Sequence, residues 1–160
     1  MGAGNEMTVS LLLGDDHNRL DAIMDEVRGR LSAGDLAGAA SRFGAFRSGL
    51  ERHIVAEEDV LFPALDRATG GRAGGPISVM RHEHAEIRKR LAEIGSILDR
   101  TSSSVTDAAS PIGELVALLG AHNGKEERIL YPMTDDSVRS SGSLEELVTR
   151  VREGLAAAAS

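Results

Sequence analysis

Hydrophobic residues recur every three or four positions along four long stretches of the chain, the spacing of the buried face of an α-helix. The pattern predicts long helices over about 10–31, 35–65, 77–98 and 110–133. A short additional helix is predicted within residues 143–158, because Ser143 and Glu146 have the spacing of a capping box. The scarcity of aromatic residues, 2% of the chain, also favours helix over sheet.

Polar breaks separate these helices and set their arrangement. Gly- and Ser-rich sequence predicts breaks at 32–34, 69–76, 101–110 and 137–142. Ser110 and Pro111 are expected to start the fourth long helix as its N-cap and first residue. Short connections favour antiparallel neighbours. The sequence therefore predicts an all-α, up-down-up-down four-helix bundle with a short extra C-terminal helix, in a single domain over 1–160 whose ligand-bearing bundle spans about 10–133.

One motif, H-x-x-x-E-E-x-x-L-[FY]-P, occurs twice, at His53–Pro63 and at His122–Pro132. Residues four apart on a helix lie close on one face, so the His and the first Glu of each copy can reach the same point. Each of the other two long helices also carries one His in register with its apolar face. The candidate metal ligands are therefore His17, His53, Glu57, His84, His122 and Glu126.

Neighbouring residues of the same type are expected to lie outside this set. His82 shares a helix with His84, but its row of the helix is polar and should face water. Glu58 and Glu127 lie about 100° further round their helices than the first Glu of each motif. They are expected to be solvated or to form hydrogen bonds at the edge of the bundle.

An aromatic residue and a proline close each copy of the motif. Proline ends or kinks a helix, and the aromatic ring is expected to plug the bundle. Tyr131 could serve as a redox or hydrogen-bonding group near the site. However, five residues separate it from Glu126, which places it about 140° away from the face of that carboxylate.

Burying two carboxylates and four imidazoles in one layer would cost on the order of 10 kcal/mol without compensation, which is comparable with the whole stability of a domain. No Lys or Arg lies on the predicted inner faces to neutralise the carboxylates. A pair of divalent cations is the natural compensation. Nitrogen and oxygen donors suit iron, while zinc, manganese or copper are possible substitutes. The chain contains no Cys, which excludes thiolate sites.

Composition narrows the classes of partner. The net charge of −7 and the absence of a basic run argue against nucleic acid binding. No stretch reaches the roughly 18–20 apolar residues that span a bilayer, so no membrane partner is expected. A cytoplasmic location is the expectation.

The arrangement of these residues resembles the hemerythrin-like, or HHE cation-binding, family. That family carries a lone His on its first helix, H-x-x-x-E on the second, E-H on the third and H-x-x-x-E on the fourth. The matching residues are His17, His53 with Glu57, Glu83 with His84, and His122 with Glu126. The resemblance implies a non-haem, di-iron centre with an oxo or hydroxo bridge, in which two Glu bridge the irons and two His bind each iron.

The same resemblance implies small ligands such as O2, NO or peroxide, and a role in oxygen, nitrosative or oxidative stress response or sensing, with peroxide or NO consumption as a possible activity. Oxygen-carrying members have a fifth His where this chain has Arg88, which argues against reversible oxygen storage. An iron-centre repair, iron storage or iron donor protein is the alternative. Repair proteins of the family usually carry a Cys-containing segment, and this chain has no Cys.

Two further classes of protein differ in the residues they require. A ferritin-like di-iron oxidase needs E-x-x-H on two helices. The residues three before the five His are Gly14, Leu50, Val79, Arg81 and Leu119, so that class is excluded. A metal-free structural or interaction bundle, with the His and Glu as a polar network, is the remaining alternative.

Overall fold

Helices make up all regular structure in residues 5–100 and 103–157, the part of the chain that the computed structural model describes. The predicted all-α class is confirmed there. The elements are α1 (Val9–Ser32), α2 (Leu36–Ala56), η1 (Glu57–Leu61), α3 (Phe62–Ala68), α4 (Gly74–Asp99), α5 (Val105–Lys125), η2 (Glu126–Leu130), α6 (Tyr131–Ser140) and α7 (Leu144–Ala156). η1 and η2 are single turns of π-helix within otherwise continuous helices.

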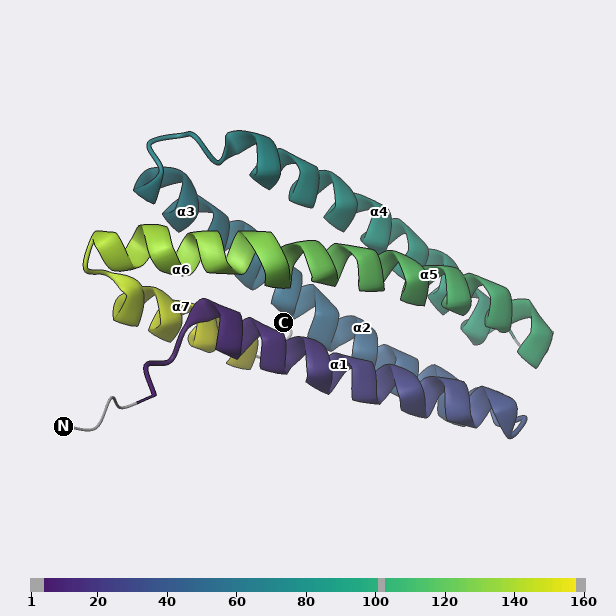
Figure 1. Cartoon of the computed structure of the whole chain (residues 1–160). Coiled ribbons are helices and arrows are strands. Elements are labelled where there is room, and N and C mark those ends of the chain that lie inside the picture. The colour runs from purple at the N-terminus through teal and green to yellow at the C-terminus, as the bar shows by residue number, and fades with distance from the viewer. Residues whose placement is uncertain (1–4, 101–102, 158–160) are drawn as a thin grey trace.

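The four longest helices lie side by side (Figure 1). α1 packs against α2 and α5, and α4 packs against the same two helices. Gly34 has a φ of 78°, which permits the tight reversal between α1 and α2. Each long helix therefore has a face toward the interior that its neighbours cover.

Two apolar clusters fill this interior, and a layer of polar residues separates them. On α1, Leu20 belongs to one cluster and Leu13 to the other. His17 lies between these two residues in the sequence and is buried with them. On α4, His84 likewise separates Ile87 from Met80. The polar layer thus lies where the predicted ligands interrupt the apolar faces.

Both copies of the repeated motif form a π turn. The backbone N–H of Phe62 donates to the carbonyl of Glu57, five residues earlier. The N–H of Tyr131 donates to the carbonyl of Glu126 in the same way. A proline follows each aromatic residue. Because proline has no N–H, it cannot make the hydrogen bond to the fourth residue back that a regular α-helix has, and the wider π turn accommodates this missing donor. The helices therefore continue into α3 and α6 instead of ending.

The additional residue in each π turn shifts the register of the residues after it. Leu130 is 2% exposed whereas Ile129 is 55% exposed, which decides between two residues that regular α-helical spacing left open. In the first copy Leu65 is fully buried, while Ala64, the residue expected to face inward, is half-buried. Simple extrapolation along an α-helix fails beyond each motif for this reason.

The predicted start of the fourth long helix at Ser110 and Pro111 is wrong. α5 begins at Val105, where the Asp107 carboxylate accepts a hydrogen bond of 2.7 Å from the backbone N–H of Ser104. This local cap stabilises an earlier start, and Pro111 is accommodated inside the helix. The first two residues of the break predicted over 101–110 lie outside the described residues.

Other predicted boundaries also move. α4 begins at Gly74, so the break predicted over 69–76 is shorter, and α6 runs to Ser140, into the break predicted over 137–142. The Ser143 side chain makes no cap to α7; it contacts the Ser141 hydroxyl at 2.9 Å instead. The helix predicted within 143–158 is present as α7, and residue 158 lies outside the described residues.

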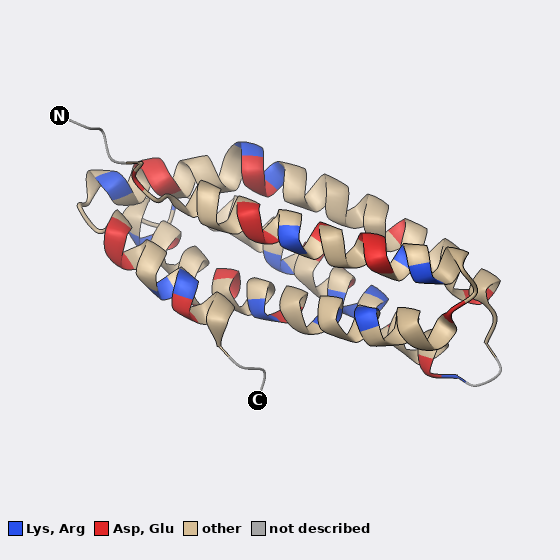
Figure 2. Cartoon of the chain, turned by 90° about the horizontal axis from the view of Figure 1, so that it is seen from below, with Lys and Arg blue, Asp and Glu red and all other residues tan. Residues whose placement is uncertain are grey.

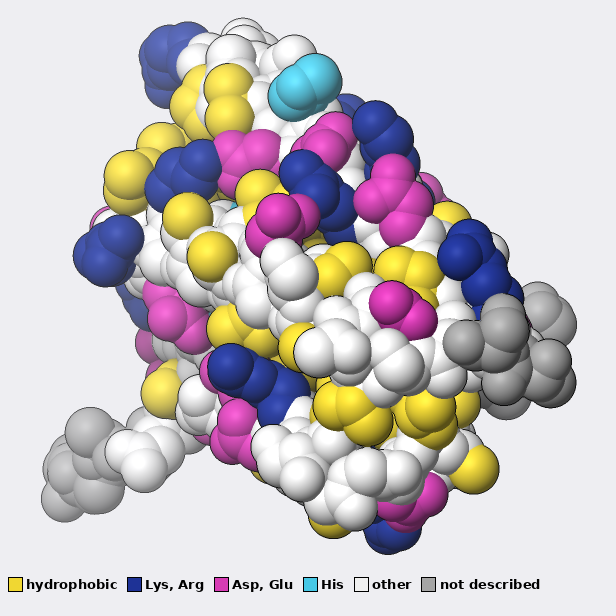
Figure 3. Space-filling view, turned by 90° about the vertical axis from the view of Figure 1, so that its right-hand side faces the viewer, with side chains coloured by type: hydrophobic (Ala, Val, Ile, Leu, Met, Phe, Trp, Pro, Cys, Tyr) yellow, Lys and Arg dark blue, Asp and Glu magenta, His cyan; other side chains and the backbone are white. Residues whose placement is uncertain are grey.

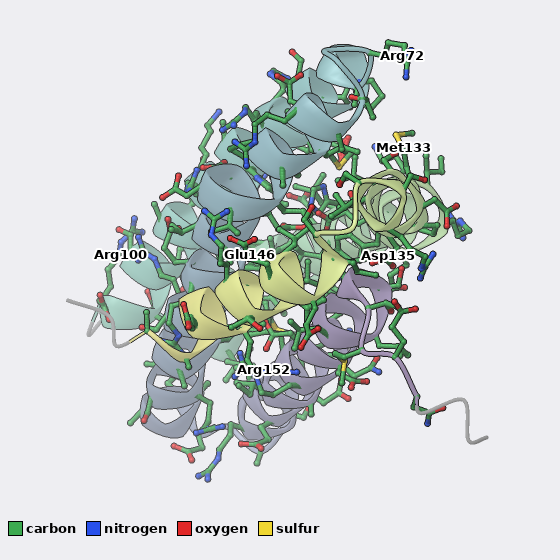
Figure 4. All side chains as sticks on the ribbon, turned by 90° about the vertical axis from the view of Figure 1, so that its left-hand side faces the viewer. Arg72, Arg100, Met133, Asp135, Glu146 and Arg152 are labelled. Carbon is green, nitrogen blue, oxygen red and sulfur yellow. The ribbon has the colours of Figure 1, made fainter. Side chains whose placement is uncertain are left out.

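α7 crosses one end of the long helices (Figure 4) and packs against α2, η1 and α1. Its apolar face is buried, and a Cβ at Gly154 would lie only 3.2 Å from the Cβ of Ala56. This close approach lets α7 cover the chain where α2 passes into η1. These contacts make α7 a packing element of the fold.

The surface is mixed in charge. Basic and acidic residues are interspersed along the helices (Figure 2), and one end of the molecule shows apolar side chains scattered among charged ones (Figure 3). None of the helices in the described part of the chain is both long and apolar enough to cross a membrane.

Candidate metal centre

Six buried side chains, from the four long helices and from the π turns that continue two of them, converge in the polar layer. Each of them is at most 3% exposed. They are called the inner donors below and are the residues expected from the sequence, namely His17, His53, Glu57, His84, His122 and Glu126. His82, the other histidine of α4, is exposed, as its polar row predicts.

The four imidazoles form two pairs. The rings of His17 and His53 are stacked with centroids 4.6 Å apart, and those of His84 and His122 meet edge to face at 4.9 Å. The first pair joins α1 and α2, and the second pair joins α4 and α5. Two pairs of nitrogen donors provide two places where a cation could bind.

Each carboxylate lies between the two pairs. Oε1 of Glu57 is 3.6 Å from Nε2 of His53 and 3.3 Å from Nε2 of His84. Oε1 of Glu126 is 3.3 Å from Nε2 of His17 and 3.2 Å from Nε2 of His122. A carboxylate that contacts one imidazole of each pair is placed to bridge two cations.

Several of these polar atoms have no hydrogen-bond partner among the described residues. They include Oε1 of Glu57, Nε2 of His84 and both oxygens of Glu126. A buried polar atom without a partner costs about 1–3 kcal/mol, and more when it is charged. Cations bound by these atoms would remove that cost, so the donor set fits a metal centre.

The inner donors divide into two overlapping groups whose ligand atoms lie within 4.8 Å of one another. One group contains Glu57, His84, His122 and Glu126. The other contains His17, His53 and Glu126. The group around His84 and His122 thus has four closely spaced members, whereas the group around His17 and His53 has three.

A carboxylate also holds the outer nitrogen, Nδ1, of every inner imidazole. These four acids are called the outer carboxylates, and their distances to Nδ1 lie between 2.8 and 3.0 Å. The pairs are Asp16 with His53, Glu127 with His17, Glu58 with His84, and Glu83 with His122. An acceptor at Nδ1 fixes the proton there and leaves Nε2 free for a metal, as in most protein metal sites with His ligands.

Basic residues in turn hold three of the outer carboxylates. Nε of Arg19 lies 2.8 Å from Asp16, and Arg88 contacts Glu58 at 3.1 Å. Lys125 pairs with Glu83. These contacts hold the three acids in place. Arg88, the residue found where oxygen carriers have a fifth His, thus supports an outer carboxylate.

The pKa values of two outer carboxylates reflect this arrangement. Burial opposes ionisation of Asp16, but hydrogen bonds from His53 and Arg19 outweigh it and lower its pKa. The pKa of Glu83 is also lowered: burial opposes this, but Lys125 and then His122 outweigh it. Both acids are therefore ionised at neutral pH and can accept a hydrogen bond from the N–H group of an imidazole.

The two inner carboxylates have opposite shifts in their pKa values. Burial raises the pKa of Glu57, and the nearby charge of Glu126 raises it further. Burial also acts on Glu126, but its interactions with Glu57 and with the imidazoles of His122 and His17 outweigh burial and hold its pKa well below the usual value. Burial disfavours a charged His122, yet Glu126 and Glu83 raise its pKa to about 9. The raised pKa values of Glu57 and His122 favour protons on these two groups.

Tyr131 lies at the centre, contrary to the sequence-based expectation. Its hydroxyl donates to Oε2 of Glu57 at 2.8 Å and lies 3.2 Å from Nε2 of His53. The expected offset of about 140° assumed a regular α-helix. The π turn η2 between Glu126 and Tyr131 invalidates that assumption. Burial, and then the charges of Glu57 and Glu126, raise the pKa of Tyr131 well above its usual value.

A groove between α1 and α5 leads from the surface to this centre. It has a volume of about 560 Å³, and His17 and Glu127 form part of its wall. Gly120 and Gly124 line it on the α5 side. Asp21 adds a further acidic group to the wall. Small molecules or cations could therefore approach the His17 side of the centre.

Comparison with known proteins agrees with the geometry. The chain matches the family described as "Hemerythrin HHE cation binding domain" over residues 9–134. It is 35% identical over 101 residues to the iron-sulfur cluster repair protein YtfE of Edwardsiella ictaluri (strain 93-146), covering 59% of this chain and 46% of that protein. The protein of the same name from Musicola paradisiaca (strain Ech703) is 31% identical over 102 residues, with 59% and 46% covered.

A third relative, the iron-sulfur cluster repair protein YtfE of Escherichia coli O81 (strain ED1a), is 33% identical over 93 residues, or 52% of this chain and 40% of that protein. The chain thus spans less than half the length of the curated relatives it matches. No solved structure matches the chain.

Proposed function

The chain belongs to the hemerythrin HHE cation-binding domain family, and we propose that it is a non-haem iron protein that supplies iron for the repair of iron–sulfur clusters. The observation that carries this proposal is the buried layer of four imidazoles and two carboxylates, each imidazole held by an outer carboxylate. The names of the relatives favour repair over the sensing of small ligands, although the sequence alone favours sensing.

The proposed centre holds two iron ions. His17 and His53 would bind one, and His84 and His122 the other, with Glu57 and Glu126 as bridges. The alternation of carboxylates and imidazole pairs supports this assignment. Iron, when bound, would supply redox chemistry and open coordination positions, while the outer carboxylates orient the rings. Zinc or manganese could occupy the same donors.

The proposal includes the up-down-up-down four-helix bundle and the single domain over 1–160. Contacts of α1 and α4 with both α2 and α5 support the bundle. The inner donors come from all four of these helices or from the π turns that continue them. A bundle interior is a common location for two-metal carboxylate sites.

A second candidate function is the binding of O2, NO or peroxide, with or without turnover. The groove beside His17 favours it, because a volume of about 560 Å³ admits small molecules to the three-donor side of the centre. Stopped-flow mixing of the iron-loaded chain with each ligand tests this function. A spectrum that does not respond to any of them would contradict it.

Iron transfer to a damaged cluster protein tests the repair proposal. The whole chain is loaded anaerobically with Fe(II), freed of excess metal, and mixed with an apo-ferredoxin and sulfide in the presence of a chelator for free iron and of a one-electron oxidant that converts Fe(II) to the Fe(III) of the finished cluster. We expect about two irons per chain, as in other two-metal sites, and recovery of the visible cluster absorbance of the ferredoxin. Iron that stays on the chain would overturn repair and leave the second candidate. Failure to bind iron would overturn both.

The Asp16→Asn substitution tests the outer carboxylates. The amide keeps the shape of the side chain but removes the charge that holds Nδ1 of His53 at 2.8 Å. Loss of such a partner typically weakens metal binding about 10- to 100-fold. Competition with a chelator of known affinity measures the change. The neighbouring Asp15→Asn, at an exposed position, is the matched control and should bind iron like the wild type.

A further inference from the structure

Tyr131 has its hydroxyl oxygen among the inner donors, on the side of the centre that has the fewer of them. We propose that this oxygen is a seventh protein ligand, bound to the iron at His17 and His53, so that the two iron positions have different chemistry. This inference rests on the proposed iron centre. It assigns to Tyr131 a role beyond the six His and Glu donors.

The distances support ligation. The hydroxyl oxygen lies 3.3 Å from Nε2 of His17, 3.2 Å from Nε2 of His53 and 2.8 Å from Oε2 of Glu57. Donors about 2.1 Å from one metal ion and at right angles to each other are about 3 Å apart. The phenol oxygen therefore occupies the position that a neighbouring ligand of these imidazoles would take.

The count of donors points to the same side. Three inner donors, His17, His53 and Glu126, gather around one position, whereas four gather around the other. Tyr131 contacts both imidazoles of the three-donor position. Its oxygen would add a fourth member to this close group, besides the Glu57 carboxylate that is proposed to bridge both positions.

Phe62 is the counterpart of Tyr131 in the first copy of the repeated motif. Its ring stacks on His84 with centroids 5.7 Å apart, as the ring of Tyr131 stacks on His17 at 5.8 Å. The two aromatic residues thus have equivalent places, but only Tyr131 carries an oxygen. The difference between Phe and Tyr at these places makes the two halves of the centre chemically distinct.

A purely structural role would explain why the Tyr131 hydroxyl donates to Glu57. It would not explain why the same oxygen lies at nearly equal distances from Nε2 of His17 and Nε2 of His53. Tyr131 is fully buried, and its ring already fills the apolar cluster that contains Leu13 and Leu61. Phenylalanine fills the same space at the equivalent place in the other half. The hydroxyl is therefore the part of the side chain that packing does not explain.

The test is spectroscopic. The whole chain is loaded with Fe(II) and oxidised in air to Fe(III), with the phenol proton released to solvent as metal binding releases protons from other donors. We expect a visible phenolate-to-iron absorption band, and resonance Raman excitation in that band should enhance tyrosine ring modes. Tyr131 is the only tyrosine in the chain, so any such modes are its own.

Two variants complete the test. Tyr131→Phe should lose the visible band while keeping iron bound at the four-donor position, and Phe62→Tyr should increase the band by adding a second phenolate. A wild-type protein that binds iron but shows neither the band nor the ring modes would overturn the inference and leave the proposed function standing. A wild-type protein that binds no iron would overturn both. An unchanged band in Phe62→Tyr would contradict the equivalence of the two places.

Discussion

Iron binding should disappear in the His84→Ala variant and persist in the His82→Ala variant. His84 is fully buried, and its Nε2 lies 3.3 Å from Oε1 of Glu57 with no hydrogen bond to occupy it. His82 is exposed two residues away on the same helix. Bound metal at about a thousand times its dissociation constant stabilises a fold by about 4 kcal/mol. We therefore expect Fe(II) to raise the unfolding midpoint of His82→Ala as in the wild type, and not that of His84→Ala.

The Glu126→Ala and His53→Ala variants should behave like His84→Ala, because each removes an inner donor. Iron per chain after gel filtration and thermal unfolding with and without Fe(II) are the two measurements. Loss of iron from His82→Ala with retention in His84→Ala would show that the register assigned to α4 is wrong. A wild type that is stable without iron and does not bind it would favour the metal-free structural bundle.

The inner donors could be predicted to lie together because helical periodicity was enough to place them. His17 and His84 lie in helices without a π turn, and the other four donors lie before a π turn or at its first residue, so the spacing of 3.6 residues per turn holds for all of them. His17 continues the stripe of Leu13 and Leu20, and all three are buried. Helix register therefore brought residues from distant parts of the chain to one layer. That these residues bind iron remains a proposal.

Beyond the π turns the same rule failed. A π turn has hydrogen bonds to the fifth residue back, so each residue advances less around the axis than in an α-helix. Tyr131 was expected to be far from the face of Glu126 and instead donates to Glu57 at 2.8 Å. The signal was available in the sequence: a proline at the same place in both copies removes an N–H that a regular helix needs, and so indicates an altered turn.

The outer carboxylates were found only in part. Glu58 and Glu127 were expected at the edge of the bundle, solvated or hydrogen-bonded, and both hold an inner imidazole. Asp16 was missed, since its partner His53 lies on another helix. An acid precedes His17, as Glu83 precedes His84, and this parallel could have indicated that both acids face a neighbouring imidazole. Contacts between helices depend on how the helices pack, which spacing within one helix does not give.

Asp135→Ala is expected to lower the free energy of unfolding by about 2–4 kcal/mol, the second large effect. The Asp135 carboxylate accepts from the backbone N–H groups of Val9 and Ser10 at 2.8 and 3.1 Å, and from the Ser10 hydroxyl at 2.6 Å. It lies beside the first turn of α1 (Figure 4) and is 5% exposed. Alanine would leave the buried N–H of Val9 without a partner. Urea unfolding of the metal-free protein measures the loss.

Asp136→Ala is the matched control, because the Asp136 side chain is 80% exposed and contacts only Arg139 at the surface. Its effect should stay within about 0.5 kcal/mol. If Asp135→Ala and Asp136→Ala destabilise the protein equally, then Asp135 stabilises α6 itself and not the contact between α6 and α1. The stability of Asp135→Asn, which keeps one acceptor oxygen, should fall between that of Asp135→Ala and that of the wild type.

Iron binding should also weaken in Asp135→Ala, because α1 carries His17 and the substitution loosens the first turn of α1. Unchanged iron binding would show that this first turn moves independently of the metal centre.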